Sequence, residues 1–175
     1  MSSTELARAV VGHLVESGIR EIVLAPGSRN APLAFAAYDA AEAGLIRLHT
    51  RIDERSAGFL ALGLTKVGSG AAVICTSGTA AANLHPALLE AVHAGVGLLA
   101  VTADRPARLR GTNANQTTDQ VGIFGPLIET VDVHAGIVRD ETALFPALEG
   151  RFRHGVPRHL NVQFEEPLVP DARWD

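Results

Sequence analysis

The sequence predicts an α/β domain of three layers, in which a mostly parallel sheet of about six strands carries helices on both faces. Short apolar runs with β-branched residues alternate along the chain with longer segments of helical periodicity. Each strand–helix–strand step of this length implies a right-handed crossover between parallel strands. The 175 residues suit one such domain, and the chain shows no internal repeat and no low-complexity segment.

The elements follow in order from the N-terminus. The first helix is expected to begin at Ser3 or Thr4, either of which can cap it, and to end before Gly18. Residues 21–25 form a short apolar run, which predicts a buried strand. Further strands are expected at 46–49, 71–75, 96–103, 127–133 and 160–164, and further helices at 31–43, 53–66, 79–93 and 141–153. A long polar loop with one helical turn is expected over 104–125.

Composition excludes several classes of protein. Hydrophobic residues make up 47% of the chain and charged residues 19%, which excludes a mainly disordered chain. No uncharged apolar run approaches the ~18–20 residues that a membrane span needs, and the N-terminus lacks the regions of a signal peptide. The single cysteine, Cys75, excludes an internal disulfide framework and a cysteine-based zinc site. We therefore expect a cytoplasmic protein.

The charged residues also restrict the partners. The net charge is −4 and the basic residues are dispersed, which argues against a nucleic-acid-binding surface. Of the 15 lysines and arginines, only Lys66 is a lysine. Guanidinium groups bind carboxylates and phosphates with a fork that lysine lacks, so the individual arginines are candidates for binding an anion.

Polar loops follow several strands of the predicted sheet. In an open parallel sheet, ligands bind beyond the carboxyl ends of the strands, so these loops are expected at one edge. They are residues 26–30, 51–55, 76–79 and 104–116. The helices behind them begin with free amide groups, which favour anions.

Standard nucleotide-binding and hydrolase motifs are absent. The first strand–helix turn lacks G-x-G-x-x-G, and the chain contains neither G-x-x-x-x-G-K-[ST] nor G-x-S-x-G. The histidines show no metal-ligand spacing, and we expect no metal ligand in this chain. His85, which is followed by Pro86 in a helical stretch, is interpreted as a packing or surface residue.

Taken singly, the polar residues of these loops also have structural interpretations. Glu54, in the first turn of a helix, can stabilise the helix dipole. Ser28 can serve as a turn hydroxyl and Arg29 as a surface charge, while Asn115 and Gln116 can tie down a long loop. The residue types alone leave both interpretations open.

Five stretches of sequence, taken together, change this balance. They are APGSRNAPLAFA (25–36), RLHTRIDERSAGFLALGLTK (47–66), TSGTAAANLHPALLEA (76–91), TADRPARLRGTNANQTTDQVGIFG (102–125) and EEPLVP (165–170). They resemble the first domain of the MenD family, the thiamine-diphosphate-dependent synthases of menaquinone biosynthesis. The resemblance covers nearly the whole chain. PGSRN, IDER, ADRP and ANQ are specific as a set, whereas thiamine-diphosphate enzymes in general share only the sheet, the glutamate and the TSG-type turn.

The resemblance implies a cofactor site for the pyrimidine end of thiamine diphosphate. Glu54 matches the family's glutamate, which bonds a ring nitrogen of the aminopyrimidine. That bond favours the imino tautomer, whose nitrogen removes the proton from C2 of the thiazolium. Other residues are expected to shape the pocket around the ring. They are Pro26, Gly27, Thr76, Ser77, Gly78 and Thr79.

The resemblance also implies two acidic substrates, 2-oxoglutarate as the donor and isochorismate as the acceptor. An arginine suits a carboxylate because it can form charge-assisted, bidentate hydrogen bonds. Amide side chains suit hydroxyl and enol-ether oxygens. The residues that match substrate-binding positions are Ser28, Arg29, Arg105, Asn115 and Gln116.

Half of the expected site is missing from these residues. The family holds the diphosphate and its Mg²⁺ with a Gly-Asp-Gly motif in a separate domain of another subunit, and this chain contains no Gly-Asp-Gly. We therefore expect residues 1–165 to be the pyrimidine-binding domain and residues 166–175 to begin a linker. The intact protein is expected to be a homo-oligomer, a dimer or a tetramer.

Two alternatives remain at this point. The glutamate and the sheet would fit another thiamine-diphosphate enzyme equally well, such as an acetolactate-synthase-like carboligase or a 2-oxo-acid decarboxylase. A non-catalytic α/β module that binds a small anion is the third interpretation. The SRN and ADRP…ANQ segments favour the first interpretation.

The missing diphosphate half leads to a direct prediction. Purified residues 1–175 should release no carbon dioxide from 2-oxoglutarate, because they lack the groups that hold the diphosphate and Mg²⁺. A carbon dioxide release assay with added thiamine diphosphate and Mg²⁺ checks this. Turnover by these residues alone would contradict the division of the site between domains.

Overall fold

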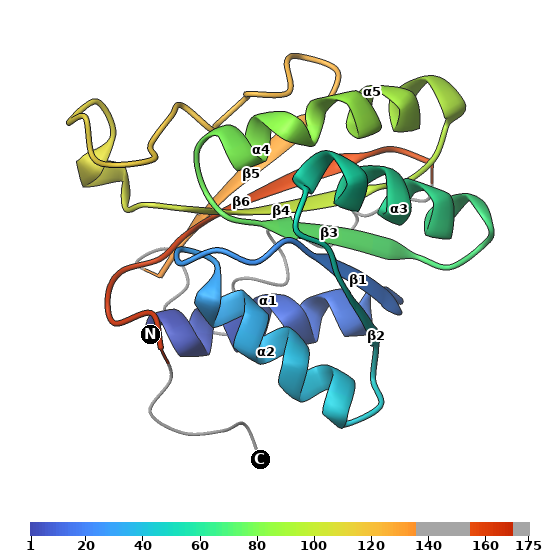
Figure 1. The fold of residues 1–175 in the computed structure, drawn as a ribbon, viewed down its shortest axis with the longest axis horizontal. Helices are drawn as coiled ribbons and strands as arrows, with labels where there is room; N and C mark the ends of the chain where they lie inside the picture. Colours follow the sequence, from blue (N-terminus) through green and yellow to red (C-terminus); the bar gives the residue numbers. More distant parts are fainter. Residues whose placement is uncertain (136–154, 170–175) are drawn as a thin grey trace.

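The computed structural model describes residues 1–135 and 155–169, and in this part six parallel strands form one sheet (Figure 1). The strand order is β2-β1-β3-β4-β6-β5. The strands are β1 (Glu21–Leu24), β2 (Arg47–Thr50), β3 (Ala71–Cys75), β4 (Leu99–Asp104), β5 (Glu129–His134) and β6 (Arg158–Gln163). The helices are α1 (Ser3–Glu16), α2 (Ala31–Glu42), α3 (Glu54–Lys66), α4 (Thr79–Asn83), α5 (His85–Ala94) and the 3₁₀ turn η1 (Ala107–Leu109). The predicted fold class is confirmed.

Helices cover both faces of the sheet and divide the core into two clusters (Figure 1). Helices α1 and α2 pack on one face, where Leu14, Ile22 and Leu33 are fully buried. Helices α3, α4 and α5 pack on the other. Small residues let α3 and α5 approach closely, since a Cβ added to Gly58 would lie 3.0 Å from the Cβ of Ala87.

The cap of α1 lies one residue earlier than predicted. Ser2, not Ser3 or Thr4, accepts a hydrogen bond from the backbone of Glu5, and the Glu5 carboxylate accepts one from the backbone of Ser2. This reciprocal pair is a capping box. Ser3 is buried instead, and its hydroxyl donates to the carbonyl of Glu165.

Other boundaries also differ from the prediction: β5 begins two residues later than expected, at Glu129, and β6 two residues earlier, at Arg158. Two further differences have a local cause. The helix predicted over 79–93 is two helices, divided at Leu84, because Pro86 in the first turn of α5 has no N–H to continue the α4 ladder. Strand β4 begins at Leu99 rather than at residue 96, because Leu98 N bonds to the carbonyl of Val96 in a tight turn. The helix predicted over 141–153 lies outside the described residues.

The packing of α1 gives a stability prediction. Leu14→Ala should lower the free energy of unfolding by about 2–5 kcal/mol, because Leu14 is fully buried in the α1–α2 cluster. Urea denaturation of the purified chain measures this. Val67→Ala, at a side chain that is 80% exposed, is the control and should change it by less than about 0.5 kcal/mol. Equal effects of the two substitutions would contradict this description of the core.

Candidate functional site

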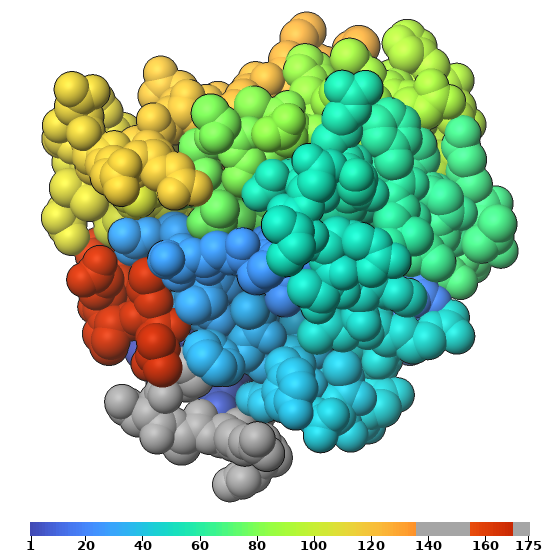
Figure 2. Space-filling view, in the orientation of Figure 1, coloured from blue at the N-terminus to red at the C-terminus, as the bar shows by residue number. Residues whose placement is uncertain are grey.

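The chain order reverses at the centre of the sheet. From β1 the chain passes outward to β2 on one side, and from β3 it passes to β4 on the other. Such a switch point leaves a crevice at the carboxyl ends of the strands. Figure 2 shows the blue β1–α2 turn, the yellow loop after β4 and the red segment after β6 meeting on one surface.

The turns after β1 and β3 touch each other. A Cβ added to Gly27 would lie 2.6 Å from the Cβ of Thr76, so only glycine fits there without a shift. Asn30 is fully buried behind this turn, and its amide donates to the carbonyl of Ala25 at 2.9 Å. The predicted pocket residues Gly27 and Thr76 are therefore neighbours at the switch point.

Glu54 is the first residue of α3 and is half-buried. Asp53 caps this helix by accepting a hydrogen bond from Ser56 N at 2.7 Å. Burial, and then the negative charge of Glu54, raise the pKa of the fully buried Cys75 thiol. The carboxylate of Glu54 therefore acts electrostatically on the end of β3, next to the Thr76 turn.

Two arginines of the loops after β1 and β4 interact electrostatically with each other. Arg105 donates from Nη1 to Ser77 Oγ at 2.6 Å and to the carbonyl of Gln116 at 2.9 Å. Burial, and then the positive charge of Arg29, lower the pKa of Arg105. Arg29 donates from Nη1 to the carbonyl of Phe164 at 3.1 Å, and its Nε is buried without a hydrogen-bond partner among the described residues.

Gln116 joins the loop after β4 to the turn after β3. Its side-chain amide donates to the carbonyl of Ser77 at 3.1 Å, and Ser77 Oγ donates to the carbonyl of Gln116 at the same distance. Gln116 has a φ of 55°, and Gly78, with a φ of 78°, lies so close that an added Cβ would be 2.8 Å from the Gln116 carbonyl oxygen. Gln116, Gly78 and Arg105 are thus brought together as predicted.

The other predicted residues are at the same edge but are less connected. Pro26, Ser28, Thr79 and Asn115 are all exposed. Within the described ranges, no hydrogen bond joins their side chains to the rest of the site. Thr79 begins α4, and its carbonyl accepts a hydrogen bond from the Asn83 amide.

A buried polar network beneath the loop was not predicted. It joins side chains on one face of β4, β5 and β6 to residues of the loop. Its members are Thr102, Asp104, Arg110, Gln120, Thr130, Asp132, His159, Asn161 and Gln163. The alternation of polar residues along 158–163 is the signal that could have indicated it.

Two titratable side chains of the buried network, Asp132 and His159, both have lowered pKa values. Burial opposes ionisation of Asp132, but hydrogen bonds from Arg110, Asn161 and Gln163 outweigh it and lower the pKa of that carboxyl. Burial lowers the pKa of His159 to about 3, against which the charge of Asp132 acts weakly. His159 is therefore neutral at physiological pH.

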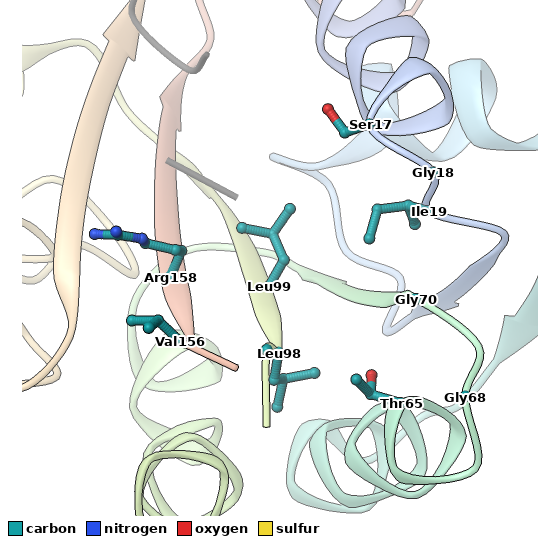
Figure 3. Close-up of a pocket in the computed structure, with 11 residues that line it drawn as sticks. Ser17, Gly18, Ile19, Thr65, Gly68, Gly70, Leu98, Leu99, Val156 and Arg158 are labelled. Carbon is teal, nitrogen blue, oxygen red and sulfur yellow. The ribbon is translucent and has the colours of Figure 1, made fainter. Parts of the chain in front are cut away.

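The described residues line a cavity at each end of the sheet. One of about 300 Å³ lies at the amino ends of the strands, opposite the predicted site, and its lining includes Ile19, Leu98, Leu99 and Val156 (Figure 3). A second of about 240 Å³ lies at the carboxyl edge between Pro106 and the ends of β5 and β6. Pro106, which follows Arg105 in the sequence, is among the residues that line it.

Neither a metal-binding cluster nor a membrane-spanning helix occurs in the part of the chain that the structure describes. No group of three or more His, Cys, Asp or Glu side chains there could hold a metal ion. None of the helices in residues 1–135 and 155–169 is long and apolar enough to cross a membrane.

The fold and site define a class of protein: a parallel α/β domain that places a carboxylate and two arginines at the carboxyl edge of its sheet. The chain belongs to the family described as thiamine pyrophosphate enzyme, N-terminal TPP binding domain, which matches residues 4–123.

The chain is most informatively compared with two named relatives. The chain is 67% identical over 173 residues to a protein of Nocardioides sp., covering 99% of this chain and 30% of the relative. It is 50% identical over 183 residues to a protein of Saccharopolyspora erythraea, covering 99% and 33%. Both are named 2-succinyl-5-enolpyruvyl-6-hydroxy-3-cyclohexene-1-carboxylate synthase. The resemblance to the MenD family is confirmed, and the chain spans about a third of the length of these relatives.

The buried histidine gives a pH prediction. The folded-state pKa of His159 is lowered from 6.5 to about 3. The neutral histidine therefore contributes fully to the free energy of unfolding above pH 6.5, and this contribution is lost as the pH falls toward 3. The loss is about 1.4 kcal/mol per pH unit. His159→Gln removes the titrating group, so urea denaturation should show the variant's stability deficit shrinking between pH 6 and pH 4. Parallel pH dependence of the two proteins would contradict a neutral buried His159.

Proposed function

We propose that this chain is the pyrimidine-binding domain of a synthase that decarboxylates 2-oxoglutarate on thiamine diphosphate and adds the succinyl unit to isochorismate. The observation that carries the proposal is the row of groups at the switch point: the carboxylate of Glu54, the Gly27–Thr76 contact and the Arg29–Arg105 pair. The names of its relatives supply the reaction class.

The residues present fit the pyrimidine end of the cofactor. Thiamine diphosphate supplies a thiazolium that acts as an electron sink for carbon dioxide loss. The Glu54 carboxylate would hold a proton shared with a nitrogen of the pyrimidine ring. The Gly27–Thr76 contact and the Gly78 backbone would shape the pocket around the ring, with Pro26, Ser77 and Thr79 at its border.

The arginine pair fits an acidic substrate. Burial lowers the pKa of Arg105 most, and the like charge of Arg29 lowers it further, so an incoming carboxylate would relieve part of this destabilisation of the charged form. We assign substrate binding to Arg29, Arg105 and Gln116, with Ser28 and Asn115 reaching in from the exposed rim.

The rest of the site is assigned to the longer protein. Diphosphate and Mg²⁺ would be held by a separate domain of a second subunit, so that the intact enzyme works as a homodimer or tetramer in the cytoplasm. Residues 1–165 would form the pyrimidine-binding domain and residues 166–175 would begin the linker. The free, buried Cys75 is compatible with a reducing compartment.

Replacing the carboxylate tests the catalytic assignment. In the full-length protein, Glu54→Gln should reduce turnover of 2-oxoglutarate by about 10²–10⁴-fold, because the amide cannot share a proton with the ring nitrogen in the same way. Carbon dioxide release at saturating cofactor measures this. Glu42→Gln makes the same chemical change at the exposed end of α2 and should leave turnover intact.

The same assay separates the alternatives. Preference for pyruvate over 2-oxoglutarate in the wild-type protein would favour an acetolactate-synthase-like carboligase. Full activity in Glu54→Gln would contradict the catalytic role of Glu54. A full-length wild-type protein that turns over neither acid would support the anion-binding module.

A further inference from the structure

Gln120 is a fully buried polar side chain that no part of the proposed mechanism uses. We propose that Gln120 is a positioning residue. It fixes the loop of Gln116, whose carbonyl accepts from Arg105, against the turn of Ser77 and Gly78. The proposal rests on the proposed function for the acidic substrates and adds a residue to that site.

The acceptor side of Gln120 holds the turn. Its Oε1 accepts a hydrogen bond from Gly78 N at 2.8 Å. Gly78 is the N-cap of α4, at a positive φ of 78°, and as a glycine it has no side chain to cap the helix. Gln120, 42 residues further along the chain, accepts the N–H of this N-cap residue and so anchors the start of α4.

The donor side of Gln120 holds the sheet. Its Nε2 donates to Asn161 Oδ1 at 2.8 Å on β6, and to Thr102 Oγ1 and the carbonyl of Ala103, both at 3.2 Å, on β4. The orientation of the amide is fixed, because a flipped side chain would place its NH₂ against the N–H of Gly78. One side chain thus ties three segments that are distant in sequence.

The partners of Gln120 are themselves held by the network. Thr130 Oγ1 lies 3.0 Å from His159 Nδ1, and His159 Nε2 lies 2.7 Å from Thr102 Oγ1. With His159 neutral, one consistent order has Thr130 donating to His159, His159 to Thr102, and Thr102 to Asn161 at 3.0 Å. The acceptors that face Gln120 therefore have little freedom to move.

This inner anchor determines the geometry of the outer contacts. Gln116 lies four residues before Gln120 and exchanges hydrogen bonds with Ser77 at the exposed edge. Arg105 rests on both, through Ser77 Oγ and the Gln116 carbonyl. Loss of the Gln120–Gly78 bond would let the loop shift from the turn, and displacements near 1 Å in a binding site can cost about 10²-fold in rate.

The experiment uses the full-length protein with four variants. Gln120→Leu keeps the volume and removes all four hydrogen bonds, whereas Gln120→Glu keeps an acceptor for Gly78 N and regains a donor when protonated. Thr118→Ala changes an exposed residue of the same loop, and Leu14→Ala lowers stability far from the site. For each variant we would measure Tm, kcat, the KM for each of the two acidic substrates, and hydrogen exchange at the Gly78 amide.

Gln120→Leu should raise the KM for at least one acidic substrate about tenfold or more and should speed exchange at Gly78. Leu14→Ala should lower Tm and leave both KM values within about twofold of wild type, since its effect on binding is indirect. Thr118→Ala should resemble wild type. In Gln120→Glu, the KM defect relative to wild type should be smaller at pH 6 than at pH 8.

Three results would overturn the proposal: unchanged exchange at Gly78 in Gln120→Leu, KM values no higher than those of Leu14→Ala at equal loss of Tm, or a Gln120→Glu defect that is independent of pH. If Gln120→Leu fails to fold, Gln120→Glu at the two pH values decides. Failure of the proposed function gives a different result, since wild type would then show no turnover while exchange at Gly78 would still report the Gln120 bond.

Discussion

The polar side chains on one face of β4, β6 and β5 need hydrogen-bond partners, because a buried polar group without one costs about 1–3 kcal/mol. On β6 these are His159, Asn161 and Gln163, which alternate with Leu160 and Val162 on the apolar face. An apolar helix could not satisfy such a surface. The long loop after β4 does so instead, with Gln120 bonded to Asn161 and Arg110 bonded to Asp132. The polarity of β6 therefore sets the path of the loop, and the loop carries half of the candidate site.

The two halves of the sheet differ in what covers them, helices in one half and a loop in the other. Beside β1 and β3 the face is apolar apart from the buried Glu21, which pairs with Arg47 and His49 of β2. Small residues such as Gly58 and Ala87 let helices pack closely on it. That half presents Glu54 from the first turn of a regular helix, whose position follows from packing. Beside β4 and β6 the polar groups recruit a loop, which presents Arg105 and Gln116 from irregular backbone. The site lies where these two halves meet, between a carboxylate held by a helix and arginines held by hydrogen bonds.

The sequence was sufficient to predict the elements whose signals are local. Alternating apolar runs and helical segments predicted the parallel sheet, and turn-forming clusters located the edge where Gly27, Glu54 and Gln116 lie. Boundaries that depend on tertiary contacts were missed. Ser3 was available as a cap, but it is buried against the Glu165 carbonyl, and Ser2 caps α1 instead. Gln120 was not predicted because its role depends on Gly78 and Asn161, 42 and 41 residues away, which nothing in its neighbourhood indicates.

The arginine pair connects this architecture to substrate choice. Arg105 is held in place by Ser77 Oγ and by the Gln116 carbonyl, both neutral acceptors, and the negative charge of Asp104 acts on it without a side-chain hydrogen bond among the described residues. Arg29 is likewise held by the neutral carbonyl of Phe164, with the Glu166 carboxylate 3.6 Å away and largely exposed. Neutral acceptors fix the direction of a guanidinium without neutralising it, so the pair retains its attraction for an anion. Because the groups are already oriented, a carboxylate that binds between them would not need to order two long side chains, and a neutral analogue of the same shape would gain nothing from the charge.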